Sequence, residues 1–122
     1  MTKEQALYHF WAGFGLPAYD EQTVPDDAVP PYITYETNVD ALDSTLALTG
    51  SLWYRTTSWE EITAKSKVIG DYIGRGGIIV PYTDGAVWIT RRAPFAQRIT
   101  DPNDDSIRRI YMSISAEYLS GD

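Results

Sequence analysis

The chain has 122 residues, of which 43% are hydrophobic and 22% charged, and its formal net charge is −7. This length and composition are ordinary for one globular domain, so we expect a single domain over residues 1–122. The absence of cysteine excludes disulfides, thiol catalysis and cysteine-bound metals. No apolar run approaches the roughly 18 residues that span a bilayer, and the N-terminus shows no signal-peptide pattern.

The negative charge is concentrated in the first third of the chain. Residues 1–43 hold eight acidic residues and only Lys3 as a base, whereas residues 44–122 hold equal numbers of acids and bases. A net acidic chain is a poor general DNA binder, because neutralising phosphates requires an excess of Lys and Arg. The polarity suits head-to-tail contact between copies, acidic edge against basic edge. The alternative is a solvated acidic loop that aids solubility.

The chain begins with a pattern typical of an amphipathic helix. Thr2 and Gln5 match a capping box, and apolar residues then recur at helical spacing, which predicts a helix over residues 2–12. Residues 20–31 are acidic and contain three prolines, so they predict a loop. The β-branched and aromatic residues 32–36 predict a strand.

The middle of the chain predicts a strand followed by a helix. Residues 46–57 alternate in polarity as a strand does, with Gly50 as a weak point that a bulge would explain. An apolar stripe at helical spacing predicts a helix over residues 59–73. Ser58 and Glu61 match a second capping box at its start.

The last third predicts strands and one long connection. Residues 77–82 and 86–90 are apolar runs, and the Asp-Gly between them is a hairpin signal. After a connection over residues 91–105 comes the longest predicted strand, residues 107–118. Its apolar and polar residues alternate, as in an antiparallel sheet covered on one side. The order of elements predicts an α+β fold, with a mainly antiparallel sheet of four to five strands and two helices packed on one face.

The predicted connection over residues 91–105 is long for a compact domain, and such connections are usually functional or disordered. Its three arginines balance its three aspartates, which suits pairing with another copy of the segment or with a polarised partner. Phe95 follows Pro94 and is an anchor candidate, an aromatic ring on a stiffened chain. The alternative is a flexible surface loop with Phe95 folded back on its own core. The candidate interface residues of this segment are Arg91, Arg92, Phe95, Arg98, Asp101 and Asp104.

A second group of interface candidates lies on the predicted strands and in the acidic loop. Tyr54, Trp88 and Tyr111 fall on strands of a sheet whose second face is expected to lack a helix. A sheet face that bears Tyr and Arg is typical of protein–protein contact. Asp26 and Asp27 are the candidates from the acidic loop.

No residue pattern in the chain indicates catalysis, a cofactor or a metal. Residues 101–105 open like a calcium loop, but Ser106 replaces the required glycine and Met112 the required glutamate. The glycine-rich residues 74–77 follow a helix, whereas phosphate-binding loops precede one. A single histidine, His9, without a cysteine does not indicate a catalytic triad. We therefore assign no catalytic, cofactor-binding or metal-binding residues.

Four stretches of the chain carry a family resemblance. They are EQALYHFWAGFGLPAYDEQTVP, PYITYE, LTGSLWYRTTSWEEITAKSKVIGDYIGRGG, and the segment with PFAQR and DPNDDSIRRIY. In this order, and covering most of the chain, they resemble the small tail terminator (tail-completion) proteins of long-tailed bacteriophages and related prophages. These motifs are structural, and the persuasive feature is their order.

The resemblance implies a non-enzymatic structural protein of the virion, in the tail or neck, assembled in the host cytoplasm. Such proteins form a ring, commonly a hexamer, at the head-proximal end of the tail tube. The ring stops tube polymerisation, offers a surface to the head connector and lets the genome DNA pass through its centre. The family fold is a small α/β sandwich, and the implied partners are other copies, the tail tube protein and the connector or stopper.

Two hypotheses about residues follow from this resemblance. Acidic residues 20–43 would keep DNA from sticking if they faced the channel, and neutralising Asp26, Asp27 and Asp40 tests that placement. Replacing Phe95 and Arg98 together by alanine is expected to weaken ring formation or tail docking while leaving the fold nearly intact.

Two alternatives remain open from the sequence. A head-completion or stopper protein of the adjacent layer is also a small ring-former. From another class, the chain would be a small ligand-binding or enzymatic α+β domain with a pocket lined by its tryptophans and tyrosines, and a deep pocket with converging polar groups would favour it.

Overall fold

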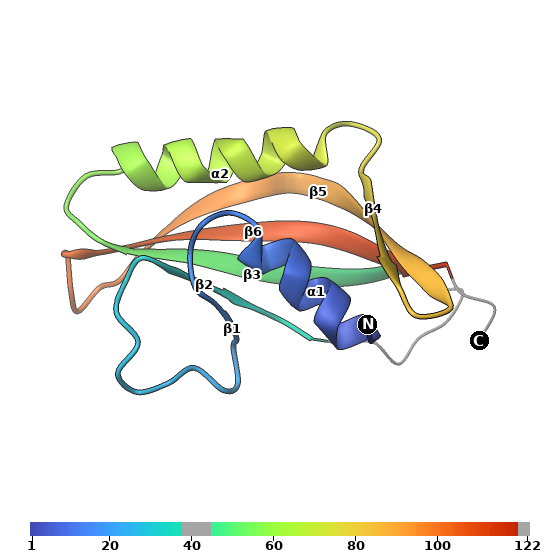
Figure 1. Ribbon diagram of the computed structural model, residues 1–122. Coiled ribbons are helices and arrows are strands. Elements are labelled where there is room, and N and C mark those ends of the chain that lie inside the picture. The colour runs from blue at the N-terminus through green and yellow to red at the C-terminus, as the bar shows by residue number, and fades with distance from the viewer. Residues whose placement is uncertain (38–44, 120–122) are drawn as a thin grey trace.

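The computed structural model describes residues 1–37 and 45–119, and it confirms the α+β fold (Figure 1). Its sheet is mainly antiparallel and has six strands, in the order β1-β2-β3-β6-β5-β4. The elements are α1 (Lys3–Ala12), β1 (Ala18–Asp20), β2 (Tyr32–Tyr35), β3 (Thr45–Arg55), α2 (Glu60–Ile73), β4 (Ile78–Tyr82), β5 (Gly85–Thr100) and β6 (Ile107–Tyr118).

The sheet has one strand more than the upper number expected. Strand β1 has only three residues and pairs in parallel with β2, aligning Ala18 with Ile33 and Asp20 with Tyr35. All the other strand pairs are antiparallel. Three residues are too few to show an alternation of apolar and polar side chains, so the local sequence does not indicate this strand. It forms because its backbone pairs with β2.

Both helices pack on one face of the sheet, as expected (Figure 1). Helix α1 lies against β1, β2 and β4, whereas α2 lies against β3, β5 and β6. The core between them includes Trp11 from α1, Ile69 from α2 and Ile114 from β6, all almost fully buried. Burying side chains of this size contributes about 1.5–3 kcal/mol each to folding. Neither described helix is long and apolar enough to cross a bilayer.

The alternation in β6 has the predicted outcome. Ile110, Met112 and Ile114 are buried under the helices, while Tyr111 and Ser113 between them stay partly exposed on the other face. This assignment follows from the period of two in an extended strand. The strand is shorter than β5, however, so the prediction that it is the longest strand is wrong.

Gly50 is not a bulge. The register runs through it without a shift, aligning it with Tyr35 on β2 and Met112 on β6. A Cβ atom built on Gly50 would lie 2.6 Å from Cη2 of Trp11. Glycine therefore stands here because the indole of α1 packs directly on the backbone of β3.

The two predicted capping boxes have different outcomes. At α1 the box is present, because the Thr2 side chain accepts from the N–H of Gln5 at 3.1 Å and Gln5 Oε1 accepts from the N–H of Thr2 at 2.8 Å. At α2 the prediction is wrong. The N-cap is Trp59, without a side-chain bond, and Ser58 accepts instead from the N–H of Glu60 at 3.1 Å. Ser58 lies one residue too early and stabilises a local turn.

The connection predicted over residues 91–105 is wrong for most of its length. Strand β5 continues to Thr100, and a turn at residues 101–106 leads into β6. Pro94 does not end the strand, since it lies in the bulge between the pairs Arg91–Ile114 and Ala96–Met112. Within the described residues, β4 pairs with β5 only at Gly85–Ile89. The rest of β5 is therefore an edge segment. Pro94 has no backbone N–H, and at an edge this removes no hydrogen bond of the sheet.

Candidate interaction surfaces

The face of the sheet opposite the helices carries a row of aromatic rings. Tyr19, Tyr32 and Trp53 come from three neighbouring strands, β1, β2 and β3, and Arg109 of β6 follows them. The Tyr19 and Tyr32 ring centroids are 5.7 Å apart, those of Tyr32 and Trp53 are 6.5 Å apart, and Arg109 Cζ lies 4.7 Å from the Trp53 ring. We call these four residues and Tyr111 the aromatic row.

Hydrogen bonds hold the aromatic row in place. Trp53 Nε1 donates to Thr34 Oγ1 at 2.8 Å, and Arg109 Nε donates to Ser51 Oγ at 3.0 Å. Arg109 also lies over the ring of Tyr111, with Cζ 5.3 Å from its centroid. Aromatic and arginine side chains held in this way lose little entropy on binding, and these residue types are enriched in protein interfaces.

Two of the three predicted sheet candidates lie on this open face. Tyr111 belongs to the aromatic row, and Trp88 is 38% exposed with its Nε1 donating to the carbonyl of Gly76 at 2.8 Å. The placement of Tyr54 on this face is wrong. Its side chain is 8% exposed on the helix-covered face, because it shares strand parity with Leu52. Burial, and secondarily Glu61, raises the pKa of Tyr54.

Sequence reasoning did not find Tyr19, Tyr32 and Trp53 as interface candidates. The parity of each strand shows which residues share a face, but it does not show which face lacks a helix. Strand register then brings Tyr32, Trp53 and Arg109 into line, and register depends on the tertiary pairing of β2, β3 and β6.

The three arginines of β5 do not act as one group. Arg92 lies toward the open face, where Nη1 donates to Ser115 Oγ at 3.2 Å. Arg98 lies toward α2, with Cζ 5.0 Å from the Trp59 ring and Nη2 donating to Thr63 Oγ1 at 3.3 Å. Arg91 also lies on the helix side, beside α2. Adjacent strand residues point to opposite faces, which explains why Arg91 and Arg92 separate.

Phe95 folds back on its own domain. It is half-buried against the core, and a Cβ atom added to Gly70 of α2 would lie 3.1 Å from its Cε2 atom. This position is the alternative considered from the sequence. Phe95 therefore supports the packing of α2 on β5, and its role as an interface anchor stays a prediction.

A hollow of about 330 Å³ opens beside Phe95, where α2 ends and β5 bulges. We call it the arginine hollow, and its lining residues are Gly74, Arg75, Arg91, Arg92, Ala93 and Phe95. The side chains of Arg75 and Arg91 are exposed and form no ion pair or hydrogen bond with any other described residue. The hollow therefore offers guanidinium donors that nothing in residues 1–37 and 45–119 occupies.

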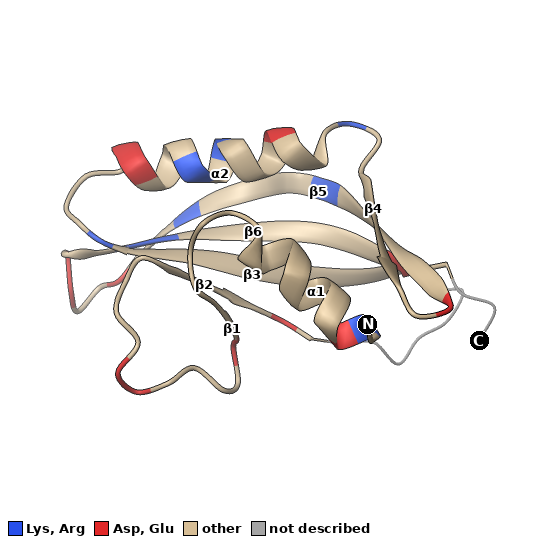
Figure 2. Cartoon of the chain, in the orientation of Figure 1, with Lys and Arg blue, Asp and Glu red and all other residues tan. Residues whose placement is uncertain are grey.

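The acidic loop between β1 and β2 holds Asp26 and Asp27 in an exposed turn. The N–H of Ala28 donates to the carbonyl of Pro25 at 3.1 Å, which closes residues 25–28; we call these residues the acidic turn. Asp20 supports its base, because Oδ1 accepts from the N–H of Gln22 at 2.9 Å. Figure 2 shows this loop, with red at its tip, projecting away from the blue positions of β5. Asp40, the other acid of the channel hypothesis, lies outside the described residues.

Asp101 and Asp104 close the turn between β5 and β6. Asp101 Oδ1 accepts from the N–H of Asn103 at 2.8 Å, and Asp104 Oδ1 accepts from the N–H of Ser106 at 2.9 Å. The hydrogen bonds from Ser106, with a smaller effect of Arg55, lower the pKa of Asp104. Such bonds are the usual use of aspartate in a tight turn.

Across the described ranges, no three His, Asp or Glu side chains gather as metal ligands would.

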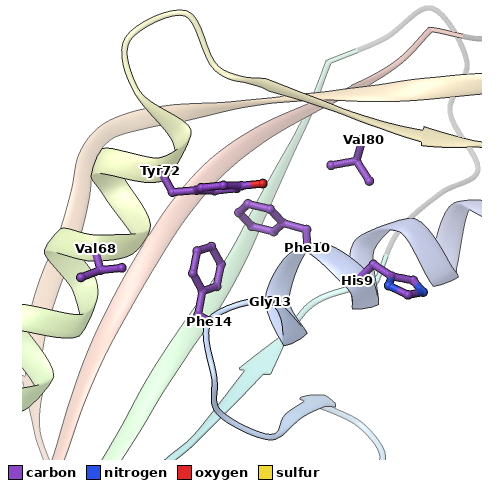
Figure 3. Close-up of a pocket in the computed structure, with 7 residues that line it drawn as sticks. All are labelled: His9, Phe10, Gly13, Phe14, Val68, Tyr72 and Val80. Carbon is purple, nitrogen blue, oxygen red and sulfur yellow. The ribbon is translucent and has the colours of Figure 1, made fainter.

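An apolar hollow of about 420 Å³ separates the two helices (Figure 3). The Phe14 ring meets those of Phe10 and Tyr72 edge to face, with centroids 5.4 Å and 5.5 Å away. His9 lies at the rim and points away from Tyr72 (Figure 3). The lining residues are His9, Phe10, Gly13, Phe14, Val68, Tyr72 and Val80. The lining includes one tyrosine and no tryptophan, so it is not the aromatic pocket that the ligand-binding alternative describes.

Comparison with known proteins gives a structural likeness. No protein-family model matches the sequence, and no curated protein is significantly similar to it. The fold is similar to a solved chain from the "Virion of native gene transfer agent (GTA) particle", with a TM-score of 0.65. The likeness covers 97% of this chain and 91% of that one at 16% sequence identity. At this identity it shows a shared fold over nearly the full length of both chains.

Proposed function

We propose that this protein is a structural component of a phage-like virion, which forms a ring at the head-proximal end of a tail tube. The ring stops tube polymerisation and joins the tail to the head connector. The observation that carries this proposal is the full-length fold likeness to a chain of a gene transfer agent virion. The sequence resemblance to tail terminators is what supports the finer part of the proposal, the position at the end of the tail tube.

The surfaces of the domain suit a subunit of a closed ring. Identical subunits close a ring through a heterologous interface, in which one surface of each copy meets a different surface of the next. The β1–β2 side carries the acidic turn, and the β5 side carries the arginine hollow, so the two sides of the sheet differ in charge (Figure 2).

The aromatic row supplies a further surface for a partner of another kind. It lies on the open face of the sheet, so it stays exposed when neighbouring copies meet at the sheet edges. Rigid Tyr, Trp and Arg side chains are the residues that dominate binding energy in protein interfaces. We assign this face to the tail tube protein or the head connector.

Removing the gene from a particle-producing strain and imaging the particles tests this function. We expect overlong tail tubes that regain their normal length when the purified protein is added during assembly. Tails of normal length beside leaking heads would indicate a stopper of the adjacent layer. Particles with normal tails and full heads would contradict a structural role in the virion.

A further inference from the structure

We infer that the acidic turn of one copy binds in the arginine hollow of the next copy around the ring. This inference rests on the proposed function, because a ring subunit needs two different surfaces that meet. It names the residues of that contact, with Asp26 and Asp27 on one side and Arg75 and Arg91, flanked by Arg92, on the other.

The arginine hollow is open to an anionic partner, since no carboxylate of residues 1–37 and 45–119 pairs with it. Its guanidinium groups present several donors in a planar fork that matches a carboxylate. Arg75 and Arg91 find no carboxylate among the described residues. Arg92 borders the hollow, but its side chain turns to the open face and donates to Ser115 Oγ. A carboxylate-bearing segment that enters the hollow would satisfy the side chains of Arg75 and Arg91.

The acidic turn has the shape and charge to be that segment. Its two carboxylates are exposed and form no ion pair or hydrogen bond with another described residue. The hydrogen bonds of Ala28 and Asp20 fix the turn and its base before binding. A turn ordered in advance loses less conformational entropy when it docks, which favours binding.

The two surfaces lie too far apart in the sheet to meet within one copy. The acidic turn joins β1 to β2 at one edge, while the hollow borders β5 at the other side of β3 and β6. A second copy placed head to tail brings them together and leaves an acidic turn open at one end and an arginine hollow open at the other. Repetition of one contact of this kind closes a ring where the rotation between successive copies returns to the first copy.

The edge of β5 disfavours the main competing mode of contact, the addition of a strand from a neighbour. The bulge between Arg91 and Ala96 contains Pro94, which has no N–H to donate. Bulges, prolines and charged side chains are the features that prevent pairing at an exposed edge. Contact at this edge therefore occurs through side chains.

Cross-linking in a chain without cysteine tests the contact directly. Val29→Cys places a thiol beside the acidic turn at a position that is 76% exposed, and Gly76→Cys places one beside the hollow, where an added Cβ meets no atom within 4 Å. Both substitutions keep every charged residue of the contact. We expect a short bismaleimide to link a mixture of the two single variants into heterodimers. The double variant should give a ladder that ends at the ring number.

Matched controls separate a specific contact from random collision. A mixture of Val29→Cys with Ala64→Cys, an exposed position on α2, should give few heterodimers.

Reversing the acidic turn with Asp26→Arg and Asp27→Arg should lower the heterodimer yield about tenfold or more, because like charges then face each other. Adding Arg75→Glu and Arg91→Glu to the other partner should restore it. Glu60→Arg with Asp105→Arg, which changes the net charge equally at exposed positions elsewhere, should leave it unchanged.

The outcomes distinguish this contact from the proposed function. Because cross-linking traps brief encounters, equal yields for the test and control mixtures at millimolar protein would overturn the contact. If the added protein still restored tail length, the proposed function would stand without it. A ladder from a protein that leaves tails unchanged would support the contact and contradict the terminator function. If the charge-reversal variants of the acidic turn cross-link as well as the wild type, the proposed contact is wrong. The acidic turn would then have another role, such as lining the channel.

Discussion

The two faces of the sheet differ in what their side chains do: one face packs against the helices, and the other stays open to partners. On β6, Met112 and Ile114 are fully buried under the helices, while Tyr111 and Ser113 between them remain partly exposed. Substitutions on the covered face should therefore change the free energy of unfolding. Substitutions on the open face should change binding and leave the fold intact. Four predictions test this division, in order of decreasing effect.

The largest expected loss is on the covered face, at Trp11. Trp11→Ala should lower the free energy of unfolding by about 3–5 kcal/mol, because a buried indole is replaced by a cavity. Urea denaturation followed by circular dichroism measures this loss. Trp53→Ala removes the same side chain from the open face and should cost about 1 kcal/mol or less. Equal losses for the two variants would contradict the division between the faces.

Gly50 tests the same contact from the other side. Gly50→Ala places a Cβ 2.6 Å from Trp11 Cη2 and should destabilise the fold by about 1–3 kcal/mol through overpacking. Gly76→Ala is the matched control, since its Cβ meets no atom within 4 Å, and it should change stability by less than about 0.5 kcal/mol. A Gly50→Ala variant as stable as the wild type would show that α1 can shift away without cost.

Phe95 lies between the two cases, because it belongs to an edge segment of β5 and its ring is only half-buried. The sequence alone predicts that Phe95→Ala with Arg98→Ala leaves the fold nearly intact. The structure changes this prediction, since Phe95 packs on α2 and Arg98 stacks on Trp59. We expect a loss of about 1–2 kcal/mol, part of the cost of a fully buried ring. Thermal melts of the double variant measure it, and an unchanged melting temperature would return Phe95 to the role of interface anchor.

Tyr118 makes the stability of the covered face depend on alkaline pH. Burial, and then Tyr82 and Glu4, raises the pKa of Tyr118 above its ordinary value. The unfolded chain therefore loses this proton first, so the stabilising difference is complete below about pH 10 and is lost as the pH rises further. In Tyr118→Phe the decline in unfolding free energy above pH 10 should be shallower, by up to about 1.4 kcal/mol per pH unit. An unaltered slope in Tyr118→Phe would contradict the assignment.

Some elements could be predicted from the sequence because short-range physics determines them. The capping box of Thr2 and the period of β6 involve neighbours a few residues apart, and both were confirmed. The hairpin between β4 and β5 follows from an Asp-Gly pair, in which Asp84 adopts a positive φ. These local signals were enough for the α+β class and for the alternation of buried and exposed residues in β6.

The strand beyond Thr90 could not be predicted, because its evidence is not local. Residues 91–100 are polar and contain a proline, which indicates a loop in isolation. They form a strand because β6 provides a complete ladder on one side. Tyr54 was misplaced for a different reason, because its strand parity with Leu48 and Leu52 already indicated the apolar face of β3.

The sequence by itself therefore determined the helices, most of the strands and the uneven charge, because periodicity, capping and composition act within short stretches of chain. Only the tertiary structure decided that the acidic turn and the arginine hollow lie at different edges of one sheet, and that Tyr32, Trp53 and Arg109 stand in a row. Strand order and register set those positions. Both arise from pairing between segments distant in the chain, which local side-chain patterns do not encode.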